Sequence, residues 1–237
     1  GAAAGADGAA GLLLLLAGGV RRLLLTHDSI TNYLAVLGSR PGVVVAAGTG
    51  VVTLAVGDAS VARVDGWGYL VGDAGSGYWV GRAGLDAVLR AFDGRGPATA
   101  LSAVVRNDFP DLAEMYLELQ GDDAKVSRIA GYARAVADLA GTDEVCRAIC
   151  RSAAGELAHS VLTGIRRVSL ASPVTVGLSG RLLGSEVLRR EVIRLVSEAH
   201  PDAQFVTGTG GSLAGVALLP TLPANSVLST WVDAAAV

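Results

Sequence analysis

The residues best suited to chemistry lie in one segment, Gly66–Trp79, which reads GWGYLVGDAGSGYW. It holds two of the chain's three tryptophans and two of its five tyrosines among several glycines, with Asp73 as its only acid. Glycines let a backbone approach a ligand closely, and aromatic rings pack on apolar faces such as that of a sugar. The Asp73 carboxylate can accept hydrogen bonds from hydroxyl groups. The same residue types also suit a Gly-rich turn packed by aromatic rings before a helix.

A second candidate is the polar cluster Thr26–Ser29, which follows an apolar run. Asp28 comes directly after this predicted strand and can act there as a general base. It can equally cap the helix that follows, and from the residues alone capping is the better interpretation. We expect the neighbouring His27 to have a structural role.

The third candidate is the turn Gly48-Thr49-Gly50, between two apolar runs. Consecutive backbone N–H groups in such a turn can surround phosphate oxygens, and the Thr49 hydroxyl can donate as well. An ordinary hairpin turn explains the same three residues.

Two more glycine-rich loops precede predicted helices, at Gly177–Gly180 and at Gly208–Ser212. Helix N-termini favour anions, and glycine leaves space for a flat ring to lie against the backbone. Each loop by itself is also explained by ordinary helix capping.

The elements that must position these loops alternate between strands and helices, which predicts an α/β fold with ligands at the strand ends. Apolar runs bounded by glycines predict strands over 20–26, 43–47, 51–56, 60–65, 174–178 and, as the last one, 204–206. Helical periodicity predicts helices over 9–18, 27–37, 75–92, 186–199 and 210–219, and a mostly helical block over 99–168 whose last helix spans 142–168.

Composition excludes several classes of protein. The 237 residues are 51% hydrophobic and 17% charged, which is typical of a globular chain with a large core. The net charge is −3 and no Lys/Arg run exceeds two residues, which argues against nucleic-acid binding. No GxxxxGK[ST] motif is present in this chain. The run Leu12–Leu16 is too short for a membrane span and lacks the basic flank of a signal peptide, so we expect a buried helix.

The two cysteines, Cys146 and Cys150, are four residues apart on one face of a predicted helix. No further Cys or His lies nearby at a spacing that suits a metal site. We therefore expect buried free thiols, no protein metal site, and a reducing, cytoplasmic compartment.

The order of these pieces adds a family resemblance. Asp28, the GTG turn, GWGYLVGDAGSGYW, a helical block, GLSG and finally GGSLAGVALL follow one another along the chain. This order resembles the N-acetylglucosamine kinase-like branch of the actin/hexokinase/Hsp70 superfamily, which includes the BadF/BadG/BcrA/BcrD ATPases. The resemblance covers about Arg21 to Leu219.

The resemblance implies an actin-like ATPase (ribonuclease H-like) fold, a mixed sheet flanked by helices plus a helical block. It divides the chain into the remainder of an N-terminal lobe (1–40), a C-terminal lobe (41–220) and a C-terminal tail (221–237).

On the sugar side, the resemblance implies that Asp28 is the catalytic aspartate, which takes the proton from the sugar's primary hydroxyl. Gly66, Trp67 and Asp73 match the sugar-contacting segment, in which Asp73 would accept from ring hydroxyls. Thr49 and Gly50 would lie near both the sugar and the γ-phosphate.

On the nucleotide side, Gly48, Thr49 and Gly50 match the second phosphate loop of the family. Gly177 and Gly180 match its adenosine loop, and Gly211 and Ser212 would lie near the base or ribose. The cofactors implied are ATP and the Mg²⁺ that accompanies it, an ion that needs few protein ligands.

The function implied is transfer of the γ-phosphate of ATP to the primary hydroxyl of an amino sugar, most simply N-acetylglucosamine. The partners are then the sugar and ATP, with a homodimer through the helical block and neither nucleic acid nor membrane. One alternative is an ATPase that activates a partner enzyme and holds an iron–sulfur cluster, although Cys146 and Cys150 are outside the expected loop context. Another is a sugar-binding homologue without catalysis.

Two departures from the family pattern are visible. Ala74 stands where the family usually has Glu after the matched aspartate. A glycine-rich DGGGT-type segment, the first phosphate loop of the family, is missing before Asp28. We expect the chain to be a fragment of a longer protein, because it begins with Gly1; a degenerate homologue is the alternative.

Overall fold

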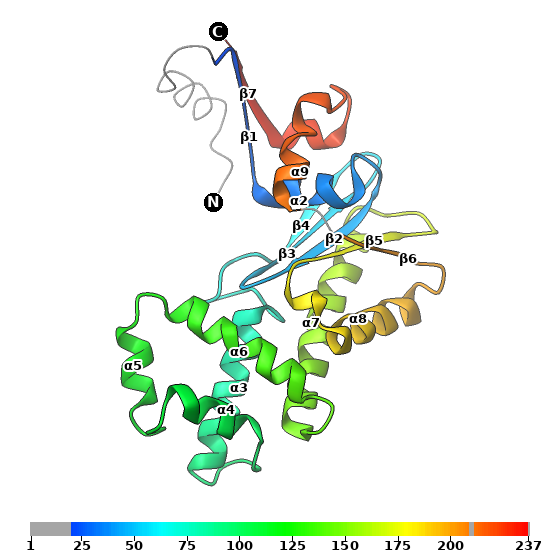
Figure 1. Ribbon diagram of the computed structural model, residues 1–237. Helices are drawn as coiled ribbons and strands as arrows, with labels where there is room; N and C mark the ends of the chain where they lie inside the picture. The colour runs from blue at the N-terminus through cyan, green and yellow to red at the C-terminus, as the bar shows by residue number, and fades with distance from the viewer. Residues whose placement is uncertain (1–19, 209–210, 237) are drawn as a thin grey trace.

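The computed structural model describes residues 20–208 and 211–236, and its centre is a five-stranded mixed sheet (Figure 1). The strand order is β4-β3-β2-β5-β6. The antiparallel half consists of β2 (Gly42–Ala47), β3 (Val51–Val56) and β4 (Val61–Val64). On the other side of β2, strands β5 (Thr175–Ser179) and β6 (Gln204–Thr207) run parallel to it. The carboxyl ends of β2 and β5 therefore meet at one edge.

Alternate residues of the central strands contribute side chains to two separate hydrophobic cores. Val43 and Val45 of β2 lie in the core shared with α7 (Glu144–Arg167) and α8 (Glu186–Ala199). Val44 points into the other core, with Ile30 and Leu34 of α2 (Asp28–Leu37). This alternation is the consequence of the two-residue period of a strand buried on both faces. The short helix α9 (Ser212–Val216) packs on α2.

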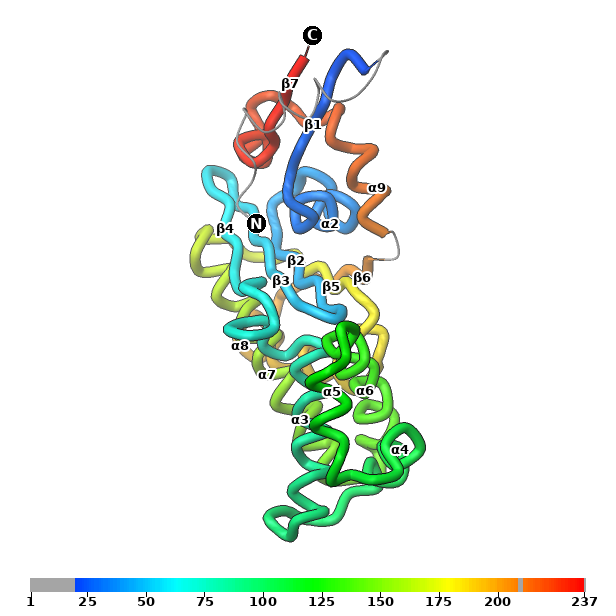
Figure 2. The backbone as a smooth tube through the Cα atoms, turned by 90° about the vertical axis from the view of Figure 1, so that its left-hand side faces the viewer, coloured from blue at the N-terminus to red at the C-terminus, as the bar shows by residue number. Residues whose placement is uncertain are grey.

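A helical block extends from one end of the sheet (Figure 1). It contains α3 (Gly77–Phe92), α4 (Leu101–Asp108), α5 (Met115–Gly121) and α6 (Lys125–Leu139). Helices α3 and α6 pack closely, since a Cβ on Gly81 of α3 would lie 1.9 Å from the carbonyl oxygen of Ile129. Figure 2, turned by 90°, shows the sheet between this block and the helices α2 and α9, which gives the molecule an elongated shape.

The expected α/β alternation is confirmed, and most predicted elements are present within one or two residues of their expected bounds. The prediction that 204–206 is the last strand is wrong. A seventh strand, β7 (Val232–Ala236), pairs antiparallel with β1 (Arg22–Thr26) in a separate two-stranded sheet. The sequence VDAAA has little strand propensity, so its partner strand rather than its own residues selects this conformation.

The helix expected over 210–219 is also shorter than predicted. Helix α9 ends at Val216, and 3₁₀ turns follow at Leu219–Thr221 and Val227–Trp231. The predicted helix over 9–18 lies outside the described residues. The division of the chain into lobes and a tail stays a prediction, although β7 shows that the predicted tail includes a paired strand.

None of the helices in the ranges 20–208 and 211–236 combines the length and the apolar character that crossing a membrane requires. Cys146 and Cys150 are free and buried inside α7, as expected.

Candidate functional site

The candidate site is built around the carboxyl ends of β2 and β5. The parallel register pairs Ala46 with Ser179, so the residues that follow each strand leave the sheet side by side. On β2 these residues are the turn Gly48-Thr49-Gly50, and on β5 they are Gly180 and Arg181. The sheet itself therefore brings two of the predicted loops together.

The Gly48–Gly50 turn is held by the first residues of α3. The N–H groups of Gly77 and Tyr78 donate to the carbonyls of Gly48 and Thr49 at 2.8 and 3.0 Å, and the N–H of Gly48 donates to the Gly50 carbonyl at 2.8 Å. All three carbonyls of the turn are thus satisfied. Among the described residues, the N–H groups of Thr49 and Gly50 have no backbone acceptor. Two free N–H groups beside a threonine hydroxyl suit a phosphate oxygen.

Asp73 lies directly against this turn. Its side chain is only 9% exposed, and its Oδ1 accepts a hydrogen bond from the N–H of Gly68 at 3.1 Å. Its Oδ2 is so close to Gly50 that a Cβ added there would lie 2.6 Å away. Burial raises the pKa of the Asp73 carboxyl, and the N–H of Gly68 opposes that rise in part. The structure therefore joins the predicted sugar carboxylate to the predicted phosphate turn.

Asp65 organises the loop that carries Asp73, and no motif in the sequence marks it. Its Oδ1 accepts from the N–H groups of Gly66 and Asp73, both at 2.8 Å, and its Oδ2 accepts from Ala74 at 2.9 Å. Both Asp65 and Asp73 have φ of +57°, a left-handed conformation that costs a non-glycine residue about 1 kcal/mol or more. An aspartate before a glycine is common in ordinary turns, so its type alone did not mark it.

Trp67 presents an aromatic surface at the outer side of the loop. The guanidinium of Arg63 lies 4.4 Å from the centre of its ring, and the same group donates to the Gly66 carbonyl at 2.7 Å. The Trp67 side chain is nevertheless 64% exposed. Beyond it, the rings of Tyr69 and Tyr78 pack at a centroid distance of 4.9 Å. This exposed, oriented indole can contact the apolar face of a ligand.

Asp28 is the first residue of α2, and the expectation that it caps this helix is wrong. The cap is His27, whose backbone is extended and whose Nδ1 accepts from the N–H of Ser29 at 3.2 Å. A residue one position inside the helix cannot take that role. The Asp28 carboxylate instead lies 2.8 Å from Nδ1 of His27 and is 82% exposed. It has the access to solvent that a base acting on an incoming substrate needs, but it does not line the pocket described next.

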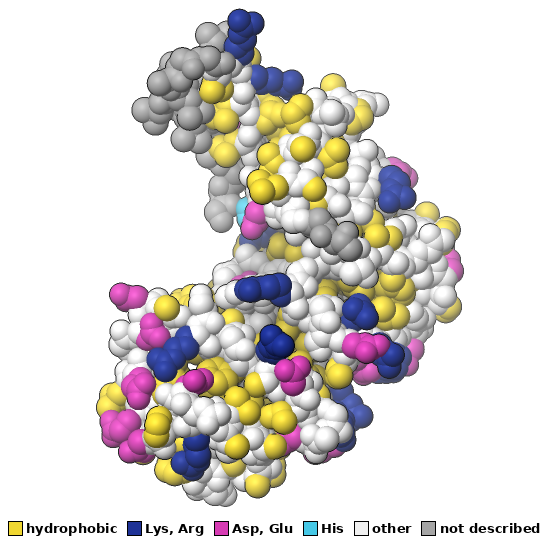
Figure 3. All heavy atoms as spheres, viewed as in Figure 1, with side chains coloured by type: hydrophobic (Ala, Val, Ile, Leu, Met, Phe, Trp, Pro, Cys, Tyr) yellow, Lys and Arg dark blue, Asp and Glu magenta, His cyan; other side chains and the backbone are white. Residues whose placement is uncertain are grey.

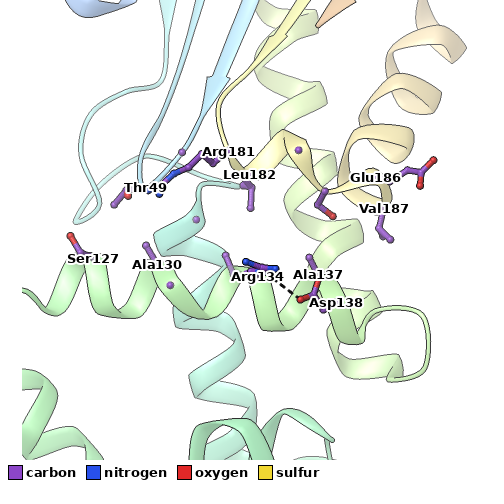
Figure 4. A pocket seen from close by; sticks show the side chains of 16 residues that line it. Thr49, Ser127, Ala130, Arg134, Ala137, Asp138, Arg181, Leu182, Glu186 and Val187 are labelled. Atoms are coloured by element: carbon purple, nitrogen blue, oxygen red, sulfur yellow. Dashed lines mark ion pairs between the residues drawn. The ribbon is translucent and has the colours of Figure 1, made fainter. Parts of the chain in front are cut away.

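A pocket of about 830 Å³ opens beside the phosphate turn (Figure 4). The turn forms one wall, α6 forms a second, and the segment from Arg181 to Val187 forms a third. In the space-filling view, basic side chains gather near the middle of the face, where the helical block meets the sheet (Figure 3). Of the predicted nucleotide-binding residues, Gly48 and Thr49 line this pocket. Its volume is in the range of sites for small molecules and cofactors.

The structure places the remaining predicted nucleotide-binding residues in different surroundings. Gly180 has φ of +96°, and a Cβ there would lie 2.2 Å from the Ala47 carbonyl oxygen, so only glycine fits at this close approach. Gly177 is buried inside β5, where a Cβ would lie 2.7 Å from Val36. A ligand cannot reach Gly177, so the prediction that it contacts adenosine is wrong. Its lack of a side chain instead allows α2 to pack closely on the sheet. Gly211 and Ser212, at the start of α9, are exposed and do not line the pocket.

The described residues contain no group of three or more acidic, His or Cys side chains that could hold a metal ion.

Comparison with known proteins gives a family. Residues 23–216 match the BadF/BadG/BcrA/BcrD ATPase family, which is most of the chain.

Two curated relatives are sugar kinases. An N-acetylmuramic acid/N-acetylglucosamine kinase of Clostridium acetobutylicum is 25% identical over 210 residues, covering 84% of this chain and 67% of that protein. An N-acetyl-D-glucosamine kinase of Dictyostelium discoideum is 30% identical over 186 residues, covering 75% of this chain and 58% of that protein.

Two solved structures have the same fold. A proposed N-acetylglucosamine kinase from Chromobacterium violaceum is 27% identical with a TM-score of 0.62, covering 81% of this chain and 64% of that one. A second from Porphyromonas gingivalis is 18% identical with a TM-score of 0.63, covering 80% and 63%. The fold is therefore the actin-like ATPase fold of these neighbours, and the chain spans about three fifths to two thirds of the length of the relatives it matches.

Proposed function

The chain belongs to the BadF/BadG/BcrA/BcrD ATPase family, and from this premise we propose that it acts as an ATP-dependent sugar kinase. The reaction is transfer of the γ-phosphate to the primary hydroxyl of N-acetylglucosamine or a related amino sugar. The observation that carries this proposal is the contact between Asp73 and Gly50. It places a carboxylate suited to sugar hydroxyls against a turn suited to phosphate, which is the juxtaposition that phosphoryl transfer to a sugar requires.

The nucleotide occupies the pocket beside Gly48 and Thr49, with its phosphates at the free N–H groups of Thr49 and Gly50. Phosphoryl transfer needs little covalent chemistry from the protein, so positioning and neutralisation of charge supply most of the catalysis. Bound together with ATP, Mg²⁺ would neutralise part of the phosphate charge, and it would need few ligands from the protein.

The sugar binds at the Gly66–Asp73 loop. Asp73 accepts hydrogen bonds from ring hydroxyls through the lone pairs that Gly68 leaves free, and Trp67 packs on the apolar face of the ring. Because both residues belong to one loop held by Asp65, their relative positions are fixed before the sugar arrives. Ala74 in place of the family Glu leaves one carboxylate fewer beside this loop.

Asp28 acts as the general base that takes the proton from the primary hydroxyl, as the family resemblance implies. Its carboxylate is exposed and adjacent to His27, so a substrate can reach it. Help from a positioned base contributes typically about 10² to 10⁴ in rate.

The buried cysteines weigh against the activator ATPase as the second candidate. Burial raises the pKa of the Cys146 thiol to about 12 and that of Cys150 to about 11. Both thiols are buried inside α7, so neither is presented at a surface where two subunits could share a cluster. Free thiols are typical of the reducing cytoplasm, where we expect the protein to act and where ATP and sugar are both available. We expect two copies of the protein to form a homodimer through the helical block.

The test is ATP-dependent phosphorylation of N-acetylglucosamine, N-acetylmuramic acid, glucosamine, N-acetylmannosamine and glucose by the full-length protein. ADP release that depends on sugar, and that falls about 10²-fold or more in Asp28→Asn, supports the kinase and names its substrate. Asp58→Asn is the matched control, because Asp58 is an exposed aspartate in the β3–β4 turn.

Other results decide between the alternatives. ATP hydrolysis that no sugar changes rejects the kinase in favour of the activator ATPase. Sugar binding without ADP release rejects it in favour of a binding protein.

A further inference from the structure

Arg181 is the residue of the pocket whose role neither the sequence motifs nor the comparisons assign. It follows Gly180 directly and is exposed. In Figure 4 its side chain extends toward Thr49, from the wall opposite α6. Its guanidinium therefore faces the turn whose free N–H groups suit phosphate.

The backbone fixes Arg181 at this place. The parallel register that pairs Ala46 with Ser179 brings Arg181 level with Gly48, two residues beyond the pair. Gly180 permits the approach, because any side chain there would collide with the Ala47 carbonyl oxygen, 2.2 Å from its Cβ. The position of Arg181 relative to the phosphate turn is therefore a property of the sheet and not of a long loop.

The charges around the pocket also single out Arg181. Arg134 on α6 is paired with Asp138 at 3.6 Å, and Glu186 on α8 is paired with Arg190 at 2.5 Å. Within residues 20–208 and 211–236, no carboxylate forms an ion pair with Arg181. Arg181 thus brings a positive charge into the pocket that no protein acid among these residues neutralises.

We infer that Arg181 binds the phosphate chain of the nucleotide and holds it against the Thr49 turn; this rests on the proposed kinase function. A guanidinium presents a planar fork of donors that matches two phosphate oxygens at once. It complements the two N–H groups of the turn, which approach the phosphates from the β2 side. The base and ribose extend from there into the space between α6 and the Arg181–Val187 segment.

The experiment measures binding of Mg·ATP, ADP and adenosine to the full-length protein by calorimetry, for wild type, Arg181→Gln and Arg181→Lys. We expect Arg181→Gln to weaken ATP and ADP binding about ten- to a hundredfold and to leave adenosine binding unchanged, since the lost bonds are charge-assisted ones to phosphate. Arg181→Lys keeps the positive charge but loses the forked pair of guanidinium donors, so it should lose less ATP affinity than Arg181→Gln. The affinity of Arg181→Gln for ATP should also depend less on salt concentration than that of the wild type.

Arg90→Gln is the matched control. It removes the same charge from an exposed arginine that is paired with Asp86 on α3 and does not line the pocket, and its nucleotide affinities should equal those of wild type. Melting temperatures confirm that each variant is folded; if Arg181→Gln is not, Arg181→Lys carries the test.

Two outcomes contradict the inference and are distinguishable. If wild type binds ATP and Arg181→Gln binds it equally well, or loses adenosine affinity to the same extent, then the assignment of Arg181 is wrong while the kinase remains. If wild type binds no nucleotide, the proposed function itself fails and this inference fails with it.

Discussion

The sugar-side loop and the nucleotide-side pocket are built on opposite physical principles. The loop from Asp65 to Asp73 is held by internal hydrogen bonds to two carboxylates, and it includes a buried acid and two non-glycine residues in left-handed conformations. The pocket is open, and Arg181 on one of its walls has no ion-pair partner among the described residues, whereas Arg134 on another wall is paired with Asp138. The loop is thus organised in advance, whereas the pocket attracts an anion by charge.

This difference fits the two ligands proposed. A neutral sugar offers only hydroxyls and a weakly apolar face, so it can be selected only by groups held in fixed positions. A nucleotide carries several negative charges, and an unpaired cation that faces the site, here Arg181, attracts it even without a rigid position.

Asp65→Ala should have the largest effect on the loop. It leaves the N–H groups of Gly66, Asp73 and Ala74 without their acceptor, and hydrogen bonds to a charged group contribute about 1.5 to 3 kcal/mol each when buried. Asp65 is half-buried, so we expect the three bonds together to stabilise the sugar-binding form of the loop by about 2 kcal/mol, which is within the range for a single such bond. The sugar KM should rise by roughly thirtyfold, with a much smaller change in the KM for ATP.

Asp58→Ala is the control, because it removes an exposed carboxylate from the neighbouring turn. Equal rises in both KM values for Asp65→Ala would show that the loop is not independent of the nucleotide pocket.

Gly50→Ala and Gly48→Ala form a matched pair within one turn. A Cβ on Gly50 would lie 2.6 Å from Oδ2 of Asp73, whereas a Cβ on Gly48 has no neighbour within 4 Å. Gly50→Ala should therefore displace Asp73 and lower kcat/KM for sugar by about tenfold, the effect of roughly 1.4 kcal/mol, and Gly48→Ala should change it little. Steady-state kinetics on both variants measures the difference, and similar losses in the two would refute the contact between Gly50 and Asp73.

The buried carboxyl of Asp73 predicts a pH dependence of sugar binding. Its pKa is raised by burial, so it takes up a proton at a higher pH than an ordinary aspartate, whose pKa is 3.8. Sugar affinity should fall on acidification while ordinary aspartates are still ionised. Titration of the sugar Kd against pH shows this, and the pH dependence should disappear in Asp73→Asn.

The same shift has a consequence for stability. A carboxyl whose folded-state pKa lies above its unfolded value binds its proton more tightly in the folded state, so its ionised form reduces stability at neutral pH. That cost disappears as the pH falls through the folded-state pKa. Asp73→Asn should therefore melt at an equal or higher temperature than wild type at pH 7 while binding sugar more weakly, and a clear drop in melting temperature would contradict this account.

Much of the fold could be predicted from local patterns. The β2–β3 hairpin follows from two apolar runs around GTG, and the bounds of α8 agree with the predicted 186–199. Strand β7 could not be predicted, since an alanine-rich segment becomes a strand only when a partner such as β1 pairs with it.

The candidate site was predicted less completely. Asp73 and the GTG turn were recognisable from their residue types and order, but Asp65 and Arg181 were not. Asp65 acts through hydrogen bonds to backbone groups up to nine residues away, and an Asp–Gly pair by itself indicates only a turn. Gly177 was misassigned because a glycine-rich loop and a glycine needed for close packing look alike in a sequence.

Residue types and spacing are enough to predict the class of fold and to mark GWGYLVGDAGSGYW as a candidate ligand-binding segment, because alternation, glycine spacing and residue type are local properties. Which loops meet depends on how the strands pair and the elements pack. The parallel pairing of β2 with β5 places Arg181 beside the phosphate turn, and the fold of the loop presses Asp73 against Gly50. Such contacts join residues far apart in the chain, and their distances depend on strand register and packing, which no local pattern specifies.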